Sequence, residues 1–563
     1  MSFDHTVDVL VVGSGGGALT SAIAAQANNA DVLVVEKSDQ YGGTSAMSGG
    51  SIWIPNSHLS GPAGGEDSRE AALEYILTSV GEKADRKRVE AYVDFGPRML
   101  KFLEENTHVI FECQPYSDYY PELPGGKRGY RTHEPYPMHA RVLGKDFETM
   151  RMPHHAIVVM DRYSMNNVEG KYLLTQAPGW QKVMAKLMAR YWFDIPMRLR
   201  GKRDGRLTMG NALIGRLRWS LNDRKIPVWL SAPMRELIIE GNRVRGAVVE
   251  KDGKLMRIEA RSGVIMGAGG FEHDQSMRDQ YLPKPTSTDW SASNTNNTGD
   301  GIKLGMAAGA ATDLMEHAWW IPVIPVPGIP RPWAIFAERS LPGLVMVDSK
   351  GQRFTNEAAP YLEAGAAIGA HHSAEASSVP AYCIFDNTFR RKYPFGPLGP
   401  GAVMPDSTLP PGIHKGIMHK AETLAELAKS IGVDPAGLED TVRKNNDYAA
   451  SGKDPDFQRG DSYYDRYYGD STHQPSPCIG PIEQAPYYAI ALYPGDIGTK
   501  GGLLTDENAR VLDKNGNVME GLYAIGNTAA SMMGTKYPGA GSTIGPSMVF
   551  GYIAARHATR AND

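Results

Sequence analysis

The amino-terminal part of the chain alternates apolar runs with a glycine-rich break. Val7 to Val12 is a continuous apolar run, which is typical of a parallel strand buried on both faces of a sheet. A glycine turn follows, then a stretch of small residues, and then a second apolar run that ends at Glu36. This order of strand, turn, helix and strand predicts a βαβ unit that opens a parallel sheet.

The turn inside this unit has the form Gly13-x-Gly15-x-x-Ala18 and predicts a dinucleotide site. Glycines let the backbone approach a pyrophosphate, and the N–H groups at the start of the next helix can receive its negative charge. Glu36 lies about 20 residues further on, where a carboxylate can accept both ribose hydroxyls. The expected contacts of the nucleotide are Gly13, Gly15, Gly16, Ala18, Glu36 and Lys37.

The segment KSDQYGGTSAMSGGSIWIPN, residues 37–56, indicates which dinucleotide is bound. It contains the glycine pairs Gly42-Gly43 and Gly49-Gly50, with three hydroxyl side chains between them. Such a stretch lets the backbone come close to a flat ring and donate hydrogen bonds to it. The expected contacts of this ring are Gly43, Thr44, Ser45, Ser48, Gly49 and Gly50.

The rest of the chain predicts a second region. The segment TGDGIKLGMAAGA, residues 298–310, opens a helix, and residues 297–489 predict an α+β capping domain. The nucleotide-binding domain is then discontinuous and consists of residues 1–296 and 490–563. The expected fold class is α/β, a Rossmann-like nucleotide-binding domain with an inserted α+β catalytic or capping domain and the substrate at their junction.

Residues 150–228 are predicted to be an insertion with a basic amphipathic helix. Eight Lys and Arg residues lie from Lys182 to Arg206, against two Asp residues. Such a helix can lie in a membrane interface through residues 180–206, or it can pack its apolar face on the protein's own core. The apolar face is Trp180, Met184, Leu187, Met188, Tyr191 and Ile195, and the opposite face carries Lys182, Lys186 and Arg190.

Composition and charge narrow the class of protein. At 563 residues, with 42% hydrophobic and 22% charged residues, the chain can bury more than one core, and a net charge of −4 gives no reason to expect nucleic acid. Cys113, Cys383 and Cys478 show no metal-ligand spacing and fit a reducing compartment. The sequence shows no secretory signal or bilayer-spanning apolar stretch. A cytoplasmic protein is expected, at the inner face of the membrane if the insertion binds lipid.

Residues 37–56 resemble the FAD-binding segment of the succinate dehydrogenase/fumarate reductase flavoprotein superfamily. Members with covalent flavin carry a histidine at the place of Gly43, so the resemblance implies noncovalent FAD. RSGVIMGAGGFEHD (261–274) and NVMEGLYAIGNTAAS (517–531) resemble further cofactor-binding segments of the superfamily. The alternative is that GAGG forms a second, NAD-binding turn. The absence of a clear following helix with a partner acid argues against this alternative. The resemblance adds Ala268, Gly269, Asp300, Gly526, Asn527, Ser542 and Ile544 to the expected FAD contacts.

Three tyrosine-bearing segments resemble the 3-ketosteroid Δ1-dehydrogenases of this superfamily. They are YSDYYPELPGGKRGYR (116–131), AERSLPGLVMVDSKGQRFTNEAAPYLEA (337–364) and KYPGAGSTIGP (536–546). The likeness covers nearly the whole chain except residues 150–228. It implies FAD-dependent 1,2-desaturation of a 3-ketosteroid such as androst-4-ene-3,17-dione, with electrons passed to an external acceptor, a quinone or another compound.

The family's roles fall on four matching positions. Tyr537 and the N–H of Gly541 bind the C3 carbonyl oxygen, Tyr361 takes the C2 proton, and Tyr119 hydrogen-bonds to Tyr361 and relays. Loss of a proton beside a ketone builds charge on the oxygen, and one good donor lowers that barrier by roughly 3 to 4 kcal/mol. Tyrosine is a poor base near neutral pH unless neighbouring donors stabilise its phenolate. Gly541 is expected to allow the close approach that a side chain would block.

Several alternatives stay open from the sequence alone. Each tyrosine can instead be a packing residue, and Tyr116 or Tyr120 can replace Tyr119. A Δ4-(5α)-dehydrogenase is the nearest rival, although DYYPE and YPGAG favour Δ1 chemistry. Fumarate reductase-like chemistry needs an arginine donor, for which Arg339 and Arg353 are the candidates. The remaining hypothesis is that the chain is a non-catalytic, flavin-dependent membrane-binding module.

For two further sets of residues, the sequence gives weaker evidence of a role in the site. Four aromatic residues are candidates for a large apolar pocket, although aromatic residues at such spacings are more often core. Three isolated histidines are expected to be structural, because nothing pairs them as a base or a metal set. The aromatic residues are Trp319, Trp320, Trp333 and Phe336, and the histidines are His133, His273 and His317.

Overall fold

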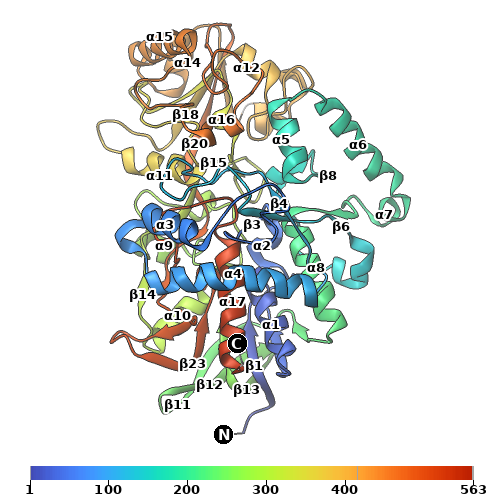
Figure 1. Ribbon diagram of the computed structural model, residues 1–563. Helices are drawn as coiled ribbons and strands as arrows, with labels where there is room; N and C mark the ends of the chain where they lie inside the picture. Colours follow the sequence, from blue (N-terminus) through green and yellow to red (C-terminus); the bar gives the residue numbers. More distant parts are fainter. Residues whose placement is uncertain (1, 415, 561–563) are drawn as a thin grey trace.

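Two sheets organise the molecule, one in each half of Figure 1. The computed structural model describes residues 2–414 and 416–560. The first sheet has eight strands in the order β10-β2-β1-β13-β12-β23-β22, with β11 paired to β12. Its strands are β1 (His5–Val12), β2 (Val32–Val35), β10 (Val228–Trp229), β11 (Met234–Glu240), β12 (Arg243–Lys251), β13 (Lys254–Met266), β22 (Arg510–Leu512) and β23 (Val518–Ala524).

The predicted βαβ unit is confirmed. β1 and β2 pair in parallel, and α1 (Gly16–Ala27) connects them. α1 crosses α17 (Ile544–Ala558) so closely that a Cβ on Gly17 would lie 2.3 Å from the carbonyl oxygen of Ser547. The small residues of α1 therefore allow close packing against α17, which comes from the other end of the chain, as well as against the sheet.

The second sheet has six strands and lies in the upper half of Figure 1. Helices α14 (Leu424–Ile431) and α15 (Pro435–Ser451) cover it, and α11 (Tyr361–His371) packs on β15 and β20. α10 (Asp300–Ala307) is the helix predicted in the segment 298–310. The strands of this sheet are β15 (Ala318–Ile324), β16 (Trp333–Ala334), β17 (Leu344–Val347), β18 (Ala381–Phe385), β19 (Met418–Ala421) and β20 (Tyr487–Thr499).

The second of the two expected domain boundaries, between residues 489 and 490, falls inside a β-strand. β20 runs across the expected boundary at residues 489 and 490, and its partners β15, β18 and β19 all belong to the second sheet. After Thr499 the chain returns to the first sheet through β22 and β23. The division into two domains stays a prediction, and on these pairings we place its second boundary after Thr499.

The expected insertion at residues 150–228 contains two different parts. α5 (Asn167–Thr175), α6 (Trp180–Phe193) and α7 (Ile195–Arg200) lie at the right edge of the molecule in Figure 1. α8 (Met209–Asp223), in contrast, is buried against α1 and α2 (Gly43–Met47), and β10 adds a strand to the first sheet. The segment from α8 onward therefore belongs to the fold around the first sheet and is not a peripheral insertion.

Part of the apolar face of the amphipathic helix α6 packs against the protein itself and is not available to a membrane. Leu187 and Tyr191 are buried in a small cluster with Tyr163, and Met184 packs against this cluster. The helix face that was expected to meet a membrane therefore contacts, in part, the protein's own α5 and β8 (Tyr163–Ser164). The apolar side chains that stay exposed lie at the end of α6 and on α7: Met188, Trp192, Phe193, Ile195 and Leu199.

Candidate active site

The glycine turn after β1 forms a close backbone cradle. Gly13 has φ +103°, and a Cβ on it would lie 2.3 Å from the carbonyl oxygen of Gly267, which follows β13. The N–H of Gly16 donates to the hydroxyl of Ser45 at 3.1 Å. The two turns thus approach each other at the carboxyl ends of the parallel strands, where nucleotides bind in sheets of this kind.

The acidic residue at the end of β2 is held in one position. Glu36 is buried, and its carboxylate accepts hydrogen bonds from the Ser14 hydroxyl at 2.6 Å and from the N–H of Ser38 at 2.9 Å. Burial raises the pKa of this carboxyl. Lys37 forms an ion pair with Asp300 at 2.7 Å, which connects the segment after β2 to α10. Glu36, Lys37 and Asp300 all line one cavity.

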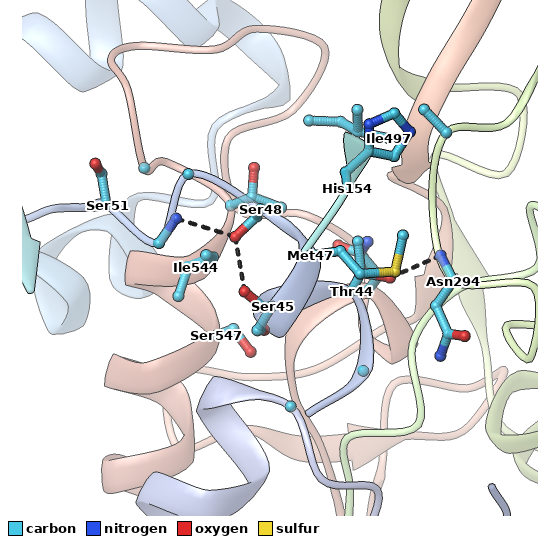
Figure 2. Close-up of a pocket in the computed structure, with 18 of the residues that line it drawn as sticks. Thr44, Ser45, Met47, Ser48, Ser51, His154, Asn294, Ile497, Ile544 and Ser547 are labelled. Atoms are coloured by element: carbon cyan, nitrogen blue, oxygen red, sulfur yellow. Dashed lines mark hydrogen bonds between the residues drawn. The ribbon is translucent and has the colours of Figure 1, made fainter. Parts of the chain in front are cut away.

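Gly43, Gly49 and Gly50 around α2 line this cavity, and Figure 2 shows Thr44, Ser45 and Ser48 between them. The Ser48 hydroxyl accepts from the N–H of Gly50 at 3.1 Å and donates to the carbonyl of Ser45 at 2.9 Å. Thr44 accepts from the N–H of Asn294 at 3.3 Å and from the Asn297 amide at 3.0 Å. The polar groups that are expected to contact a flat ring are therefore held in place by hydrogen bonds within the protein.

Most of the residues expected to bind the cofactor lie on this cavity, and three do not. Ala18 packs under the turn against Gly267, and Ser542 closes its own loop through hydrogen bonds with Gly539. Gly16 faces α17, since a Cβ on it would make an ordinary contact of 3.5 Å with Ile544. The cavity is lined by Gly13, Gly15, Glu36, Lys37, Gly43, Thr44, Ser45, Ser48, Gly49, Gly50, Ala268, Gly269, Asp300, Gly526, Asn527 and Ile544.

The same cavity, of about 420 Å³, continues to the three tyrosines predicted to be catalytic. Tyr119, Tyr361 and Tyr537 line it, and all three are buried. The ring centroids of Tyr119 and Tyr537 are 5.0 Å apart, those of Tyr361 and Tyr537 are 5.4 Å apart, and those of Tyr119 and Tyr361 are 5.8 Å apart. The fold thus brings together three segments that are far apart in the sequence.

Hydrogen bonds connect these groups. The Tyr537 oxygen accepts from the Thr543 hydroxyl at 3.0 Å, and it also interacts with Tyr361 and with the N–H of Gly541. Tyr119 hydrogen-bonds to Tyr361 in the sense that lowers the pKa of Tyr361. Burial is nevertheless the largest effect, and it raises the pKa of Tyr361, Tyr119 and Tyr537 above the ordinary value of a phenol.

The backbone around Gly541 leaves no room for a side chain. Its φ is +103°, and a Cβ on it would lie 2.6 Å from the carbonyl carbon of Ile52 and 2.7 Å from the carbonyl oxygen of Ser51. The collision is with the backbone of Ser51 and of β3 (Ile52–Trp53), and the expected close approach of Gly541 to a ligand stays a prediction. The glycine lets the loop turn its N–H toward the Tyr537 hydroxyl.

The segment that carries Tyr119 is held from behind by buried charges. Arg131 donates to Asp118 at 2.8 Å and to Asp67 at 2.6 Å, and the Trp53 indole donates to Asp118 at 2.8 Å. The N–H of Tyr119 donates to the carbonyl of Pro538 at 2.8 Å. This last bond couples the Tyr119 segment directly to the loop of Tyr537.

The residues considered for other functions lie away from the cavity or are bonded elsewhere. Arg339 donates to backbone carbonyls, including that of Ala359 at 3.2 Å, and Arg353 forms ion pairs with Glu357 and Asp454 at 2.7 Å. Neither arginine lines the cavity, so neither can donate a proton to a ligand in it. His133 is bonded to Ser57 at 2.7 Å, which agrees with a structural role.

Of the four aromatic candidates, only Phe336 lines the main cavity. Trp319 lies behind Tyr537, with ring centroids 5.0 Å apart. Trp320 and Trp333 are not part of the cavity wall.

The sequence reading missed two groups of cavity residues. Asn294 and Asn297 lie in the asparagine-rich segment 291–300, whose composition could have drawn attention. The short helix α16 (Tyr463–Tyr468) places Tyr464, Tyr467 and Tyr468 on the cavity wall, and the run YYDRYY was the available signal. Neither group could be assigned to the site without knowing which faces turn inward.

The fold and this site define an FAD-dependent flavoprotein oxidoreductase. The FAD binding domain family matches residues 8–544. The chain is 40% identical over 567 residues to a 3-oxosteroid 1-dehydrogenase of Mycobacterium tuberculosis, which covers 98% of both chains. It is also 35% identical over 566 residues to a 4-oxocyclohexanecarboxylate 2-dehydrogenase of Sinomonas cyclohexanicum, covering 98% of this chain and 92% of the relative.

A solved structure gives the same result. The crystal structure of 3-ketosteroid Δ1-dehydrogenase from Sterolibacterium denitrificans in complex with 1,4-androstadiene-3,17-dione superposes with a TM-score of 0.95 at 46% identity, over 99% of this chain and 100% of that one. The chain belongs to the 3-oxosteroid 1-dehydrogenase family of FAD-binding flavoproteins. The predicted family, fold class and cofactor are thereby confirmed.

Proposed function

We propose that this enzyme introduces a double bond between C1 and C2 of a 3-ketosteroid such as androst-4-ene-3,17-dione, with the residue roles expected above. The observation that carries the proposal is the convergence of the Tyr537 hydroxyl and the Gly541 N–H, next to the hydrogen-bonded pair Tyr361 and Tyr119. FAD, when bound, supplies the acceptor of the hydride from C1. The activities of two relatives, both on cyclic ketones, agree with this proposal.

The oxygen side of the site would stabilise the developing enolate. The N–H of Gly541 and the hydroxyl of Tyr537 hydrogen-bond to each other, so a carbonyl oxygen placed between them would receive a hydrogen bond from each, and burial of Tyr537 keeps water away. Donors that are already oriented do not need to reorganise as charge forms, so each contributes to catalysis about 10²–10³-fold. Thr543, bonded to Tyr537, would keep the phenol oriented.

The base side of the site consists of Tyr361 supported by Tyr119. Removal of the C2 proton requires Tyr361 as a phenolate, and burial opposes this state. The hydrogen bond from Tyr119 favours it, which gives that residue a chemical task beyond packing. Tyr361 therefore takes the proton and becomes neutral, and Tyr119, which stabilised the phenolate before the transfer, relays the proton onward.

The direct test mixes purified, FAD-loaded protein with androst-4-ene-3,17-dione and an artificial electron acceptor. We expect bleaching of the flavin absorbance in the absence of acceptor, and with acceptor a 1,4-dien-3-one product identified by mass spectrometry and NMR. A product desaturated at C4–C5 from a 5α-substrate, and none at C1–C2, would assign the Δ4-(5α) reaction instead. No bleaching with any 3-ketosteroid, but turnover of 4-oxocyclohexanecarboxylate, would move the substrate to a smaller ketone.

We further propose that FAD is held noncovalently. Gly43, at the position where covalent flavoproteins of the superfamily carry a histidine, has no side chain to form a bond with the ring. Acid precipitation should release all of the yellow colour into the supernatant, and colour retained in the pellet would disprove this mode of attachment.

The electrons are proposed to leave to an external acceptor, a quinone or another compound, rather than to NAD. The GAGG turn at residues 267–270 lines the FAD cavity itself through Gly267, Ala268 and Gly269, so it is not free to form a second nucleotide site. Reduced enzyme should be reoxidised rapidly by a soluble quinone analogue and not by NAD. Rapid reoxidation by NAD would reverse this assignment.

We also propose that the enzyme is a cytoplasmic protein that touches the inner face of the membrane through the α6–α7 tip, defined as Met188, Trp192, Phe193, Ile195 and Leu199. Among the described residues no helix is long and apolar enough to cross a bilayer. Phe193 and Leu199 are 81% and 85% exposed, an arrangement that costs free energy in water. Exposed cations flank the tip and could meet anionic headgroups: Lys182, Lys186, Arg200 and Lys202.

The tip can be tested by flotation with vesicles that contain anionic phospholipid. The enzyme should bind, and the double variant Phe193→Ser with Leu199→Ser should lose most of this binding while keeping turnover of a water-soluble steroid. Leu255→Ser is the matched control, because Leu255 is 66% exposed on β13 and lies outside the tip. Equal binding of all three proteins would contradict the proposal.

A further inference from the structure

We propose that Lys171 and Tyr116 form a polar end of the substrate cavity that binds an anionic group, such as the carboxylate of a C17 side chain, at the opposite end of the steroid from its ketone. This inference rests on the function proposed above and specifies its substrate class. Androst-4-ene-3,17-dione has no such group, so the site would add affinity for steroids that keep an acidic side chain.

A row of tyrosine rings connects the ketone-binding end of the cavity to Lys171. The ring centroids of Tyr119 and Tyr464 are 4.9 Å apart, those of Tyr464 and Tyr468 are 5.2 Å apart, and those of Tyr468 and Tyr467 are 5.0 Å apart. The ammonium of Lys171 lies 3.3 Å from the ring centroid of Tyr467. A fused steroid nucleus is rigid and apolar, and such a wall would direct its far end toward Lys171.

Lys171 is a half-buried cation without an acidic partner. It lines the cavity, and among the described residues no carboxylate oxygen lies within 4.0 Å of its ammonium. Burial lowers the pKa of Lys171 to about 8. Its contact with the Tyr467 ring is a cation–π interaction, which compensates only part of the lost hydration. An anionic ligand would supply the missing partner.

Tyr116 provides a second polar group at the same place. Its side chain is buried and lines the cavity, and its hydroxyl has no hydrogen-bond partner among the described residues. Its ring lies edge-on to Tyr467 with centroids 5.9 Å apart, so Lys171 and Tyr116 both contact the same side chain. Buried hydroxyls are rarely left without a partner, and this one can donate to a bound carboxylate.

Of the two acidic residues whose charge acts on Tyr116, Glu134 and Glu112, Glu134 has the larger effect. Glu134 accepts from the N–H of Asn167 at 3.0 Å, and its other oxygen has no partner among the described residues. Burial raises the pKa of Glu134 to about 7, so near neutral pH the carboxyl is partly uncharged and repels an anion less than an ordinary glutamate does.

The position of Lys171 is fixed by its helix. Asn166 caps α5 in a capping box with Glu169, and the bond from Asn167 to Glu134 anchors the start of α5 to β5 (Thr132–Pro135). One face of α5 lines the cavity through Asn167, Gly170, Lys171 and Leu174, at the spacing expected for one side of a helix. Lys171 therefore projects from a rigid wall.

The inference is tested with 3-oxochol-4-en-24-oic acid, whose side chain ends in a charged carboxylate, and with its methyl ester, whose side chain is neutral and longer by one methyl group. The wild-type enzyme should show a KM about tenfold lower for the acid than for the ester, the size of one hydrogen bond to a charged group. Lys171→Gln should bring the ratio to about one, Lys171→Arg should retain it, and Tyr116→Phe should reduce it in part.

Two controls separate this inference from the function on which it rests. Lys145→Gln removes an exposed lysine outside the cavity and should keep the wild-type ratio. Binding of both steroids is measured independently from the quenching of flavin fluorescence, so the ratio is obtained even without turnover. Equal affinities of the wild type for acid and ester, or a preference that survives Lys171→Gln, would overturn the inference. Failure of all 3-ketosteroids to react would instead overturn the proposed function.

Discussion

The ring of Tyr119 stacks on the ring of Tyr537 with centroids 5.0 Å apart and planes 16° apart. Tyr361 stands edge-on to both rings, so the proposed base and the proposed carbonyl-binding group share a common support. Because the hydroxyls of these residues hydrogen-bond to one another, a change in one alters the pKa of its neighbours.

Tyr537→Phe should lower kcat by about 10²–10³-fold, because it removes one oriented donor to the enolate oxygen. The ring contacts with Tyr119 and Trp319 persist, so the melting temperature and the FAD content should stay close to those of the wild type. Steady-state kinetics with androst-4-ene-3,17-dione measures the loss. Tyr448→Phe, which removes a hydroxyl from the surface of α15, is the control, and an equal effect of both variants would exclude a specific role of Tyr537.

Turnover should rise with pH across the range from about pH 6 to about pH 9. As the proposed base, Tyr361 would act as a phenolate. Burial raises its pKa, so below that pKa the active fraction should grow as protons are removed. Tyr119→Phe removes a hydrogen bond that lowers this pKa, so the profile should move to higher pH and the rate at neutral pH should fall. Profiles of kcat/KM against pH test both statements, and an unshifted profile in Tyr119→Phe would assign that residue to packing.

Gly541→Ala should destabilise the protein and nearly abolish turnover. The left-handed φ costs about 1–3 kcal/mol for a residue with a side chain, and the collision with Ile52 adds to it. Gly309→Ala is a matched control, because Gly309 has φ +98° and open space around its Cβ position. Thermal unfolding should therefore show a larger loss for Gly541→Ala than for Gly309→Ala, and equal losses would mean that the contact with Ile52 is irrelevant.

Gly13→Ala should strongly reduce FAD binding. The new Cβ would lie 2.3 Å from the Gly267 carbonyl oxygen and would force apart the two turns that form the nucleotide cradle. Gly16→Ala, where the nearest atom would be at 3.5 Å, should keep most of the cofactor. The ratio of flavin to protein absorbance after purification measures occupancy, and full occupancy in Gly13→Ala would remove this turn from the cofactor site.

Local sequence patterns determined the βαβ unit and the class of cofactor. A buried parallel strand needs a continuous apolar run, and a turn beside a pyrophosphate needs glycine, so Val7 to Val12 and Gly13 show their roles without knowledge of distant residues. The tyrosine roles came from a family resemblance, since no periodicity distinguishes Tyr361 from a core residue. The structure agrees with the resemblance in bringing Tyr119, Tyr361 and Tyr537 to one cavity.

Only the tertiary structure decided which partner each surface meets. The apolar face of α6 could bury itself in lipid or in protein with the same spacing, and the packing of Leu187 and Tyr191 with Tyr163 settled that choice for those residues. In the same way, β20 follows the strand pattern on both sides of residue 489, but its pairing assigns it to the second sheet. Sequence periodicity specifies which side of an element is apolar, whereas long-range contacts specify what that side covers.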